Sequence, residues 1–200
     1  MIQTDIPDPK VVFGTYARRL ADALQQLDLG AVETLARELL DCWRSGRQVF
    51  FIGNGGSAGN ATHLANDYLY PLSKKFGSGI RVQGLAANSA VLTCLANDEG
   101  YDQVYSMQLG VLARPGDVLI AFSGSGNSGN ILRALETARE LGMRSFAVLG
   151  FTGGKAKALV DVPIHVEVHD MQVAEDLQMA VGHMVMQWLF AHRDIVDPQR

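Results

Sequence analysis

The chain has 200 residues, of which 48% are hydrophobic, enough for a single domain with one sizeable core. Its 17 basic and 21 acidic residues give a net charge of −4, so no broad cationic surface for a nucleic-acid backbone is expected. No apolar run reaches the roughly 18 residues of a membrane-spanning helix, and the N-terminal residues lack the pattern of a secretory signal. We therefore expect a cytoplasmic protein that binds neither nucleic acid nor membranes.

The N-terminal part of the chain shows helical periodicity. Apolar side chains recur at helical spacing over residues 11–27 and again over 30–44, which predicts two helices before the first strand. The run Gln48–Ile52 is short, apolar and followed by glycines, as is typical of a strand buried on both faces of a parallel sheet.

The rest of the chain alternates between strand-like and helix-like segments. Further strands are predicted at 81–85, 117–122, 145–149 and 162–166. Helices are predicted at 58–70, 89–95, 102–112, 130–141 and 172–192. This alternation predicts a three-layer α/β/α domain on a five-stranded parallel sheet. Residues 1–200 then form one domain, with N-terminal helices at about 11–44, an α/β core at about 47–168 and a C-terminal helix at about 172–192.

The cysteines predict no disulfide framework. Cys42 and Cys94 are the only two, and each lies in an apolar segment. We expect both to be buried free thiols rather than a disulfide pair or metal ligands.

Two turns rich in glycine and serine follow predicted strands, at 53–57 and at 123–129. Ligands of a parallel α/β sheet bind beyond the carboxyl ends of its strands, which is where both turns fall. Glycines let the backbone approach a ligand closely, and the helix that follows each turn offers free N–H donors. These turns are candidate phosphate-binding loops.

Three kinds of phosphate site compete as interpretations of these turns. A Walker A loop needs a lysine at the helix start, and neither turn contains one. The dinucleotide fingerprint is formally matched at 124–129 and 53–58, but the acidic residue that would bind a ribose is missing after the strands that follow. A phosphomonoester site built from Ser123, Ser125 and Ser128 is favoured, and a plain capped turn is the structural alternative.

Histidines and carboxylates recur at helical spacing in two predicted helices. His63 and Asp67 are four residues apart, and Glu175 and His183 are eight apart, so each pair shares one helix face. Two nitrogen and two oxygen ligands would suit zinc or another divalent transition metal. The same groups could instead exchange protons with a substrate, or be an ordinary surface pair and a hydrogen-bonded core histidine.

The ordered motifs resemble the sugar isomerase (SIS) domain, most closely its phosphoheptose isomerase branch. They are Gly-Asn-Gly-Gly-Ser at 53–57 followed by His63, Cys-Leu-Ala-Asn-Asp at 94–98, and the segment 116–128, and the similarity extends over about 16–189. The resemblance implies a flavodoxin-like three-layer fold and a homotetramer with active sites between subunits. It also implies conversion of sedoheptulose 7-phosphate to D-glycero-D-manno-heptose 7-phosphate for bacterial lipopolysaccharide or other surface polysaccharide.

The resemblance assigns roles to individual residues. It implies that Asp67 is the base and His183 the acid of an enediol mechanism. It implies a zinc ion, or another divalent transition metal, held by His63, Asp67, Glu175 and His183. The substrate-binding residues it implies are Asn54, Gly55, Gly56, Ser57, Asn97, Asp98, Ser123, Gly124, Ser125, Ser128 and Glu175.

Three positions depart from the family pattern. Asp67 stands where the isomerases usually carry Glu, Glu175 where they carry Gln, and Gln178 where a His is common. The alternatives are an isomerase of a different phosphosugar, or a non-catalytic member of the fold that binds a protein such as a replication initiator. Retention of His63, a carboxylate at 67 and His183 favours the enzyme.

Overall fold

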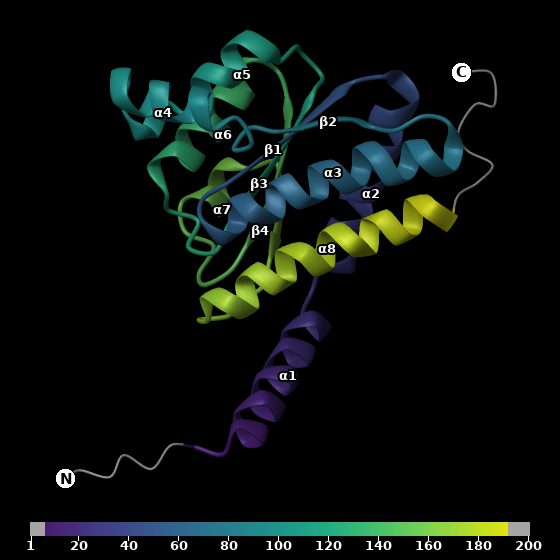
Figure 1. Ribbon diagram of the computed structural model, residues 1–200, viewed down its shortest axis with the longest axis vertical. Coiled ribbons are helices and arrows are strands. Elements are labelled where there is room, and N and C mark those ends of the chain that lie inside the picture. The colour runs from purple at the N-terminus through teal and green to yellow at the C-terminus, as the bar shows by residue number, and fades with distance from the viewer. Residues whose placement is uncertain (1–6, 192–200) are drawn as a thin grey trace.

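The computed structural model describes residues 7–191, which form the predicted α/β domain (Figure 1). The strands are β1 (Gln48–Gly53), β2 (Arg81–Gly84), β3 (Val118–Ser123), β4 (Arg144–Leu149) and β5 (Val162–His165). The α-helices are α1 (Pro9–Gln25), α2 (Leu29–Ser45), α3 (Gly56–Phe76), α4 (Ser89–Asp98), α5 (Ser106–Leu112), α6 (Gly129–Glu140), α7 (Ala156–Leu159) and α8 (Met171–Ala191). A 3₁₀ turn, η1 (Tyr101–Gln103), precedes α5.

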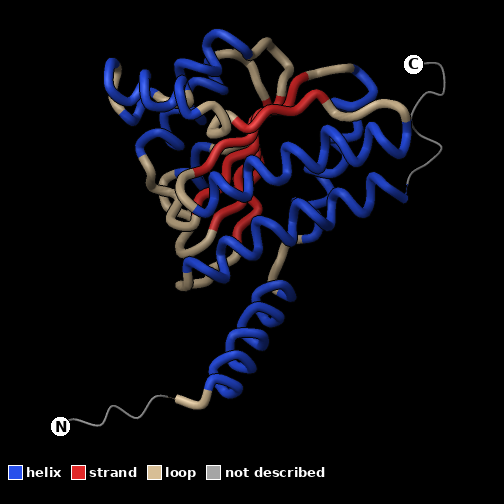
Figure 2. Tube along the Cα trace, in the orientation of Figure 1, coloured by secondary structure: helices blue, strands red, loops and turns tan. Residues whose placement is uncertain are grey.

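The five strands form one parallel sheet in the order β2-β1-β3-β4-β5, which lies at the centre of the domain (Figure 2). All six residues of β3 are buried, as the continuous apolar run predicted. In the pairing of β1 with β3, Gly53 lies opposite Phe122. The turns that follow these two strands therefore emerge side by side at the carboxyl edge of the sheet.

Two helical layers cover the sheet, which confirms the predicted three-layer architecture. Side chains alternate along each strand, so that Phe51 faces one layer while Phe50 and Ile52 face the other. The first layer is built mainly by α2, α3 and α8, and the second by α5, α6 and α7. Helix α1 projects from this body (Figure 1) and meets it through α8.

Some element boundaries differ from those predicted. The helix expected at 102–112 is divided into η1 and α5. Helix α3 continues through Pro71, where the prediction ended it, and the four residues of α7 were not predicted. The end predicted for the last helix, at 192, lies outside the described residues. In the described part of the chain, no helix has the length and apolar character that a membrane crossing requires.

The two cysteines differ in environment. Cys42 is buried in the core as expected, and this desolvation raises the pKa of its thiol to about 12. The prediction for Cys94 is wrong, because that thiol is exposed and lies 3.3 Å from Asp98 Oδ2. Apolar composition was misleading here, since α4 buries none of its residues within the described chain.

Candidate active site

A cavity of about 260 Å³ lies between the two turns that follow β1 and β3. We call residues 53–57 the glycine turn and residues 123–128 the serine loop. The described residues that line the cavity are Asn54, Gly55, Gly56, Ser57, Phe122, Ser123, Gly124, Ser125, Ser128, Met171 and Glu175. The structure thus brings together the predicted substrate residues of both turns and Glu175 of α8.

The start of each following helix is left open toward this cavity. Gly55 is the N-cap of α3 and Ser128 the N-cap of α6, and neither makes a side-chain capping hydrogen bond. Within the serine loop, the N–H of Gly126 donates to Ser123 Oγ at 3.0 Å and that of Asn127 to Ser125 Oγ at 3.3 Å. Both hydroxyls accept these bonds, so each retains its own hydrogen for a ligand oxygen. Such an arrangement suits a phosphate group.

Two residues that the sequence did not single out hold the glycine turn. The side-chain amides of Asn54 and Asn130 exchange two hydrogen bonds of 2.8 Å. The hydroxyl of Tyr101 also donates to Asn54 Oδ1, at 3.1 Å. Asn130 is almost completely buried, and an asparagine in the first turn of a helix was the only sequence signal for it. Through these bonds, α6 and η1 fix the turn that forms the opposite wall of the cavity.

Three side chains from α3 and α8 converge on one point. His63 Nε2 lies 3.2 Å from Asp67 Oδ2 and 3.4 Å from His183 Nε2, and His183 Nε2 lies 3.6 Å from Asp67 Oδ2. One ligand atom from each residue lies within 4.8 Å of the others. We call these three residues the His-Asp-His cluster. Both imidazoles are about half exposed, so the cluster is open to a ligand.

Close packing of α3 on α8 explains this convergence. A Cβ at Gly182 would lie 2.4 Å from Leu64 Cδ1, so only glycine lets the two helices approach this closely. The hydroxyl of Tyr68 donates to the carbonyl of Gly182 at 2.7 Å. Leu64 directly follows His63 in the chain, and Gly182 directly precedes His183. Their contact therefore determines the separation of His63 and His183.

Glu175 faces the cavity of the serine loop and is not one of the described residues in the His-Asp-His cluster. A Cβ at Gly56 would lie 2.3 Å from Glu175 Oε2, so the glycine makes room for this carboxylate. Among the described residues that line the cavity, Glu175 alone is charged. The metal-binding role expected for Glu175 stays a prediction.

Asn97 and Asp98 lie at the end of α4, exposed and outside the described lining of the cavity. The amide of Asn97 donates to Asp98 Oδ1 at 2.8 Å, and this bond together with that from Cys94 lowers the pKa of the Asp98 carboxyl. Their expected contact with substrate stays a prediction, since this chain alone does not bring them to the serine loop.

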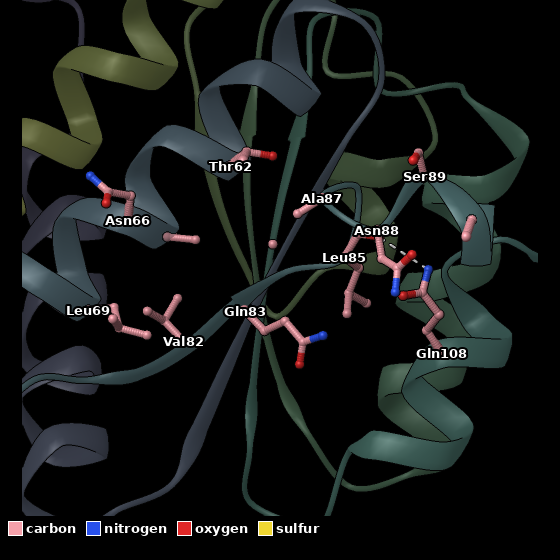
Figure 3. Close-up of a pocket in the computed structure, with 13 residues that line it drawn as sticks. Thr62, Asn66, Leu69, Val82, Gln83, Leu85, Ala87, Asn88, Ser89 and Gln108 are labelled. Atoms are coloured by element: carbon pink, nitrogen blue, oxygen red, sulfur yellow. Dashed lines mark hydrogen bonds between the residues drawn. The ribbon is translucent and has the colours of Figure 1, made fainter. Parts of the chain in front are cut away.

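Two other cavities flank α3. One of about 590 Å³ lies between α3 and the edge strand β2 (Figure 3), and none of the described residues that line it is titratable. Among its polar side chains, Gln108 donates to the carbonyl of Leu85 at 3.2 Å. A more open one, of about 670 Å³, reaches His63 itself. Of these two cavities, only the more open one therefore has a residue of the His-Asp-His cluster in its described lining.

Comparison with known proteins places this architecture in a family. Residues 13–150 match the model of the SIS domain. The chain is 37% identical over 158 residues to a phosphoheptose isomerase of Akkermansia muciniphila, with 78% of this chain and 82% of that protein covered. It is 40% identical over 142 residues to a phosphoheptose isomerase of Rhodospirillum rubrum, with 71% and 75% covered.

Comparison with solved structures supports the same family. A phosphoheptose isomerase structure from Neisseria gonorrhoeae superposes with a TM-score of 0.82 at 28% identity, covering 91% of this chain and 98% of that one. The chain belongs to the SIS-domain family. Within it, the relatives described above are phosphoheptose isomerases, which confirms the resemblance inferred from the motifs.

Proposed function

We propose that the chain is an aldose/ketose isomerase of a phosphorylated sugar, converting sedoheptulose 7-phosphate to D-glycero-D-manno-heptose 7-phosphate. The observation that carries the proposal is the His-Asp-His cluster, which gathers a carboxylate and two imidazoles from distant parts of the chain. The names of the relatives support the choice of substrate.

The proposed reaction moves one proton between neighbouring carbons. Asp67 takes a proton from the carbon beside the carbonyl, and the C–H electron pair becomes the double bond of an enediol. His183 donates a proton to the carbonyl oxygen and later accepts one from the neighbouring hydroxyl. Return of the first proton to the other carbon completes the exchange. The 3.6 Å between Asp67 Oδ2 and His183 Nε2 allows both groups to reach the same pair of carbons.

A divalent metal belongs to the same proposal. Two imidazole nitrogens and one carboxylate oxygen within 4.8 Å of one another form a donor set that suits zinc and related transition metals. We propose that His63, Asp67 and His183 hold it through one ligand atom each, which leaves the second carboxylate oxygen of Asp67 and the second ring nitrogen of His183 for proton exchange. When bound, the ion would act as a Lewis acid toward the substrate carbonyl.

The distance between the two sites favours a long sugar. Glu175 lines the cavity of the serine loop, and His183 lies eight residues further along α8, which is about 12 Å along the helix axis. A phosphate bound at the serine loop then needs a chain of several carbons to bring its carbonyl to the cluster. A heptulose phosphate has that reach, whereas a triose phosphate is too short.

We propose that the protein acts as a cytoplasmic homotetramer with sites shared between subunits. Exposed apolar side chains support self-association: Phe13 of α1 is 67% exposed and Val111 of α5 is 73% exposed. Helix α4 also buries none of its residues within the described chain. A second copy that covered these surfaces would remove them from water. The proposed pathway, surface polysaccharide synthesis, follows from the proposed substrate.

Turnover and metal content together test the proposal. Purified protein is incubated with sedoheptulose 7-phosphate, and with pentose and hexose phosphates for comparison, and products are followed by ³¹P NMR. We expect conversion of the heptulose phosphate above all others and about one divalent ion per chain. An Asp67→Asn variant should lose turnover while retaining its fold. Absence of turnover with every sugar would contradict the proposal and favour a non-catalytic SIS protein.

A further inference from the structure

The β4–α7 loop, residues 150–155, lies against the serine loop. Three backbone N–H groups of this region donate hydrogen bonds to it: Gly150 to the Gly124 carbonyl at 3.1 Å, Lys155 to Asn127 Oδ1 at 3.1 Å, and Ala156 to the Gly126 carbonyl at 2.9 Å. The amide of Asn127 in turn donates to the carbonyl of Ser125, at 3.1 Å. The serine loop therefore takes its shape partly from the β4–α7 loop.

Glycines bring the two loops into backbone contact. A Cβ at Gly126 would lie 2.1 Å from the carbonyl oxygen of Gly153, and one at Gly154 would lie 2.5 Å from that of Ser125. Gly126 and Gly154 also have φ values of 65° and 52°, which side-chain residues rarely adopt. Backbones this close leave the serine loop no room to shift unless the β4–α7 loop shifts with it.

Phe151 adopts an unusual conformation within the β4–α7 loop. Its φ of 45° makes it the one non-glycine residue with a positive φ in the described chain. Such a conformation is strained and persists only where surrounding contacts impose it. The N–H of Phe151 donates to the carbonyl of Val168 at 3.0 Å, and its own carbonyl lies 2.9 Å from His165 Nε2. The imidazole of His165 is thus the side chain that holds this carbonyl.

A lysine fixes the orientation of that imidazole. Lys157 Nζ lies 3.1 Å from His165 Nδ1. Because a lysine ammonium can only donate hydrogen bonds, Nδ1 accepts and Nε2 carries the ring hydrogen. His165 therefore donates to the Phe151 carbonyl, and Lys157, His165 and Phe151 form one connected chain of hydrogen bonds.

We propose that His165 is a positioning residue for phosphate binding. By holding the Phe151 carbonyl it fixes the β4–α7 loop, which in turn fixes the serine loop in its ligand-binding shape. This inference rests on the proposed use of the serine loop for a phosphate group. The His-Asp-His cluster lies on α3 and α8, away from this chain of bonds. Loss of His165 should weaken phosphate binding and leave proton transfer almost unchanged.

The test compares His165→Ala and His165→Gln with the unmodified full chain. The dissociation constant for inorganic phosphate is measured by calorimetry, and kcat and KM are measured with sedoheptulose 7-phosphate. For His165→Ala we expect the phosphate dissociation constant and KM to rise about tenfold, equivalent to roughly 1.4 kcal/mol. The kcat should stay within about twofold. His165→Gln should recover most of the affinity, because a glutamine amide can donate to the same carbonyl.

Two lysine variants complete the design, and a melting curve of each variant shows whether it is folded. Lys157→Ala should weaken phosphate binding by less than His165→Ala. Lys74→Ala, in the last turn of α3 and so at the opposite end of that helix from the cavity, should not change it. The inference is overturned if folded His165→Ala binds phosphate normally, if glutamine gives no rescue, or if kcat falls as much as affinity. If His165→Ala does not fold, the Lys157→Ala and His165→Gln results decide.

Phosphate affinity needs no turnover, so the two proposals fail separately. A protein that binds inorganic phosphate but converts no sugar overturns the proposed function and leaves the comparison of variants intact. A full chain that binds no phosphate overturns the inference about His165.

Discussion

His63 and His183 approach each other to 3.4 Å between their Nε2 atoms, although they are 120 positions apart in the chain. Their ring centroids are 5.6 Å apart with the rings nearly perpendicular. Both rings point to the carboxylate of Asp67. Three polar side chains placed in this way at the surface of two packed helices do not stabilise the core, which favours the roles in ligand binding and proton transfer proposed above.

The first prediction concerns the contact that sets this distance. Gly182→Ala would place a Cβ 2.4 Å from Leu64 Cδ1, so α3 and α8 must separate or Leu64 must leave its rotamer. We expect a loss of about 1–3 kcal/mol in the free energy of unfolding, measured by urea denaturation. Metal affinity should fall as well, because His63 and His183 move apart.

Gly110→Ala is the matched control for that experiment. Gly110 lies in α5, is exposed, and has open space where its Cβ would be. The same substitution there should stabilise the protein by up to about 1 kcal/mol through helix propensity. Equal stability changes at both positions would show that the Leu64 contact does not matter.

The second prediction separates proton transfer from binding. His183→Ala removes the proposed acid and should lower kcat by about 10²- to 10⁴-fold. KM should change much less, because the phosphate end of the substrate binds at the serine loop. Steady-state kinetics with the heptulose phosphate measure both constants, and Gln172→Ala on the exposed side of α8 serves as control. A His183→Ala variant that retained its kcat would remove this residue from the mechanism.

The third prediction is the converse and concerns Ser125. Its Oγ accepts from the N–H of Asn127, which leaves the hydroxyl hydrogen for a phosphate oxygen. Ser125→Ala should raise KM about tenfold, consistent with loss of one hydrogen bond to a charged group, while kcat changes little. Inhibition by inorganic phosphate should weaken by the same factor. Ser45→Ala, at the exposed end of α2, should leave both constants unchanged.

The fourth prediction compares the loss of a proposed metal ligand with the loss of a residue that only hydrogen-bonds to a ligand. His63→Ala removes a ligand and should weaken binding of Co²⁺, followed by its visible absorption, by more than the roughly 10- to 100-fold loss typical of an outer partner. Asn66→Ala removes only such a partner, since its amide donates to Asp67 Oδ1 at 3.2 Å. The smaller loss is therefore expected for Asn66→Ala. Identical affinities in both variants and the unmodified protein would place the metal elsewhere.

The sequence predicts much of this fold because its signals are local. The central strands β1, β3 and β4 are buried on both faces, so continuous apolar runs such as Gln48–Ile52 locate them to within a residue or two. Glycines and serines directly after a strand are also a local signal, and they locate the two turns. Helix spacing also places His63 and Asp67 on one face.

Features that depend on tertiary packing cannot be predicted from such local patterns. The apolar residues of α4 predict burial of Cys94, yet only the opposite side of that helix, with Leu92 and Leu95, packs partly against the core, and Cys94 stays exposed. The contact between His63 and His183 depends on how closely α3 and α8 pack. The glycine at 182 permits this close packing, but a glycine in the sequence does not by itself predict it. Glu175 shares a helix face with His183, but its carboxylate lies in the cavity of the serine loop because Gly56 leaves room there.

The fifth prediction concerns the start of α8 and its dependence on pH. Asp170 Oδ1 accepts from the N–H groups of Gln172 and Val173, at 2.9 and 3.2 Å, and its other oxygen pairs with Arg19 of α1. The hydrogen bond from Val173 and the pair with Arg19 lower the pKa of this carboxyl, although partial burial opposes them. The ionised carboxylate is therefore the form that the folded state favours.

A lowered pKa in the folded state fixes the sign of the effect. The stabilisation is fully present above the ordinary carboxyl pKa of roughly 3.9, and is lost as the pH falls through the lower folded-state value. Asp170→Asn keeps a side chain that can cap the helix but removes the charge, so at pH 7 its Tm should be lower by about 2–4 °C. This difference from the unmodified protein should shrink steadily in melting curves recorded from pH 5 to pH 3. A difference that stayed constant over this range would mean that the charge of Asp170 contributes nothing and that α1 is held to α8 by other contacts, such as the hydrogen bond from Tyr16 to Asp176.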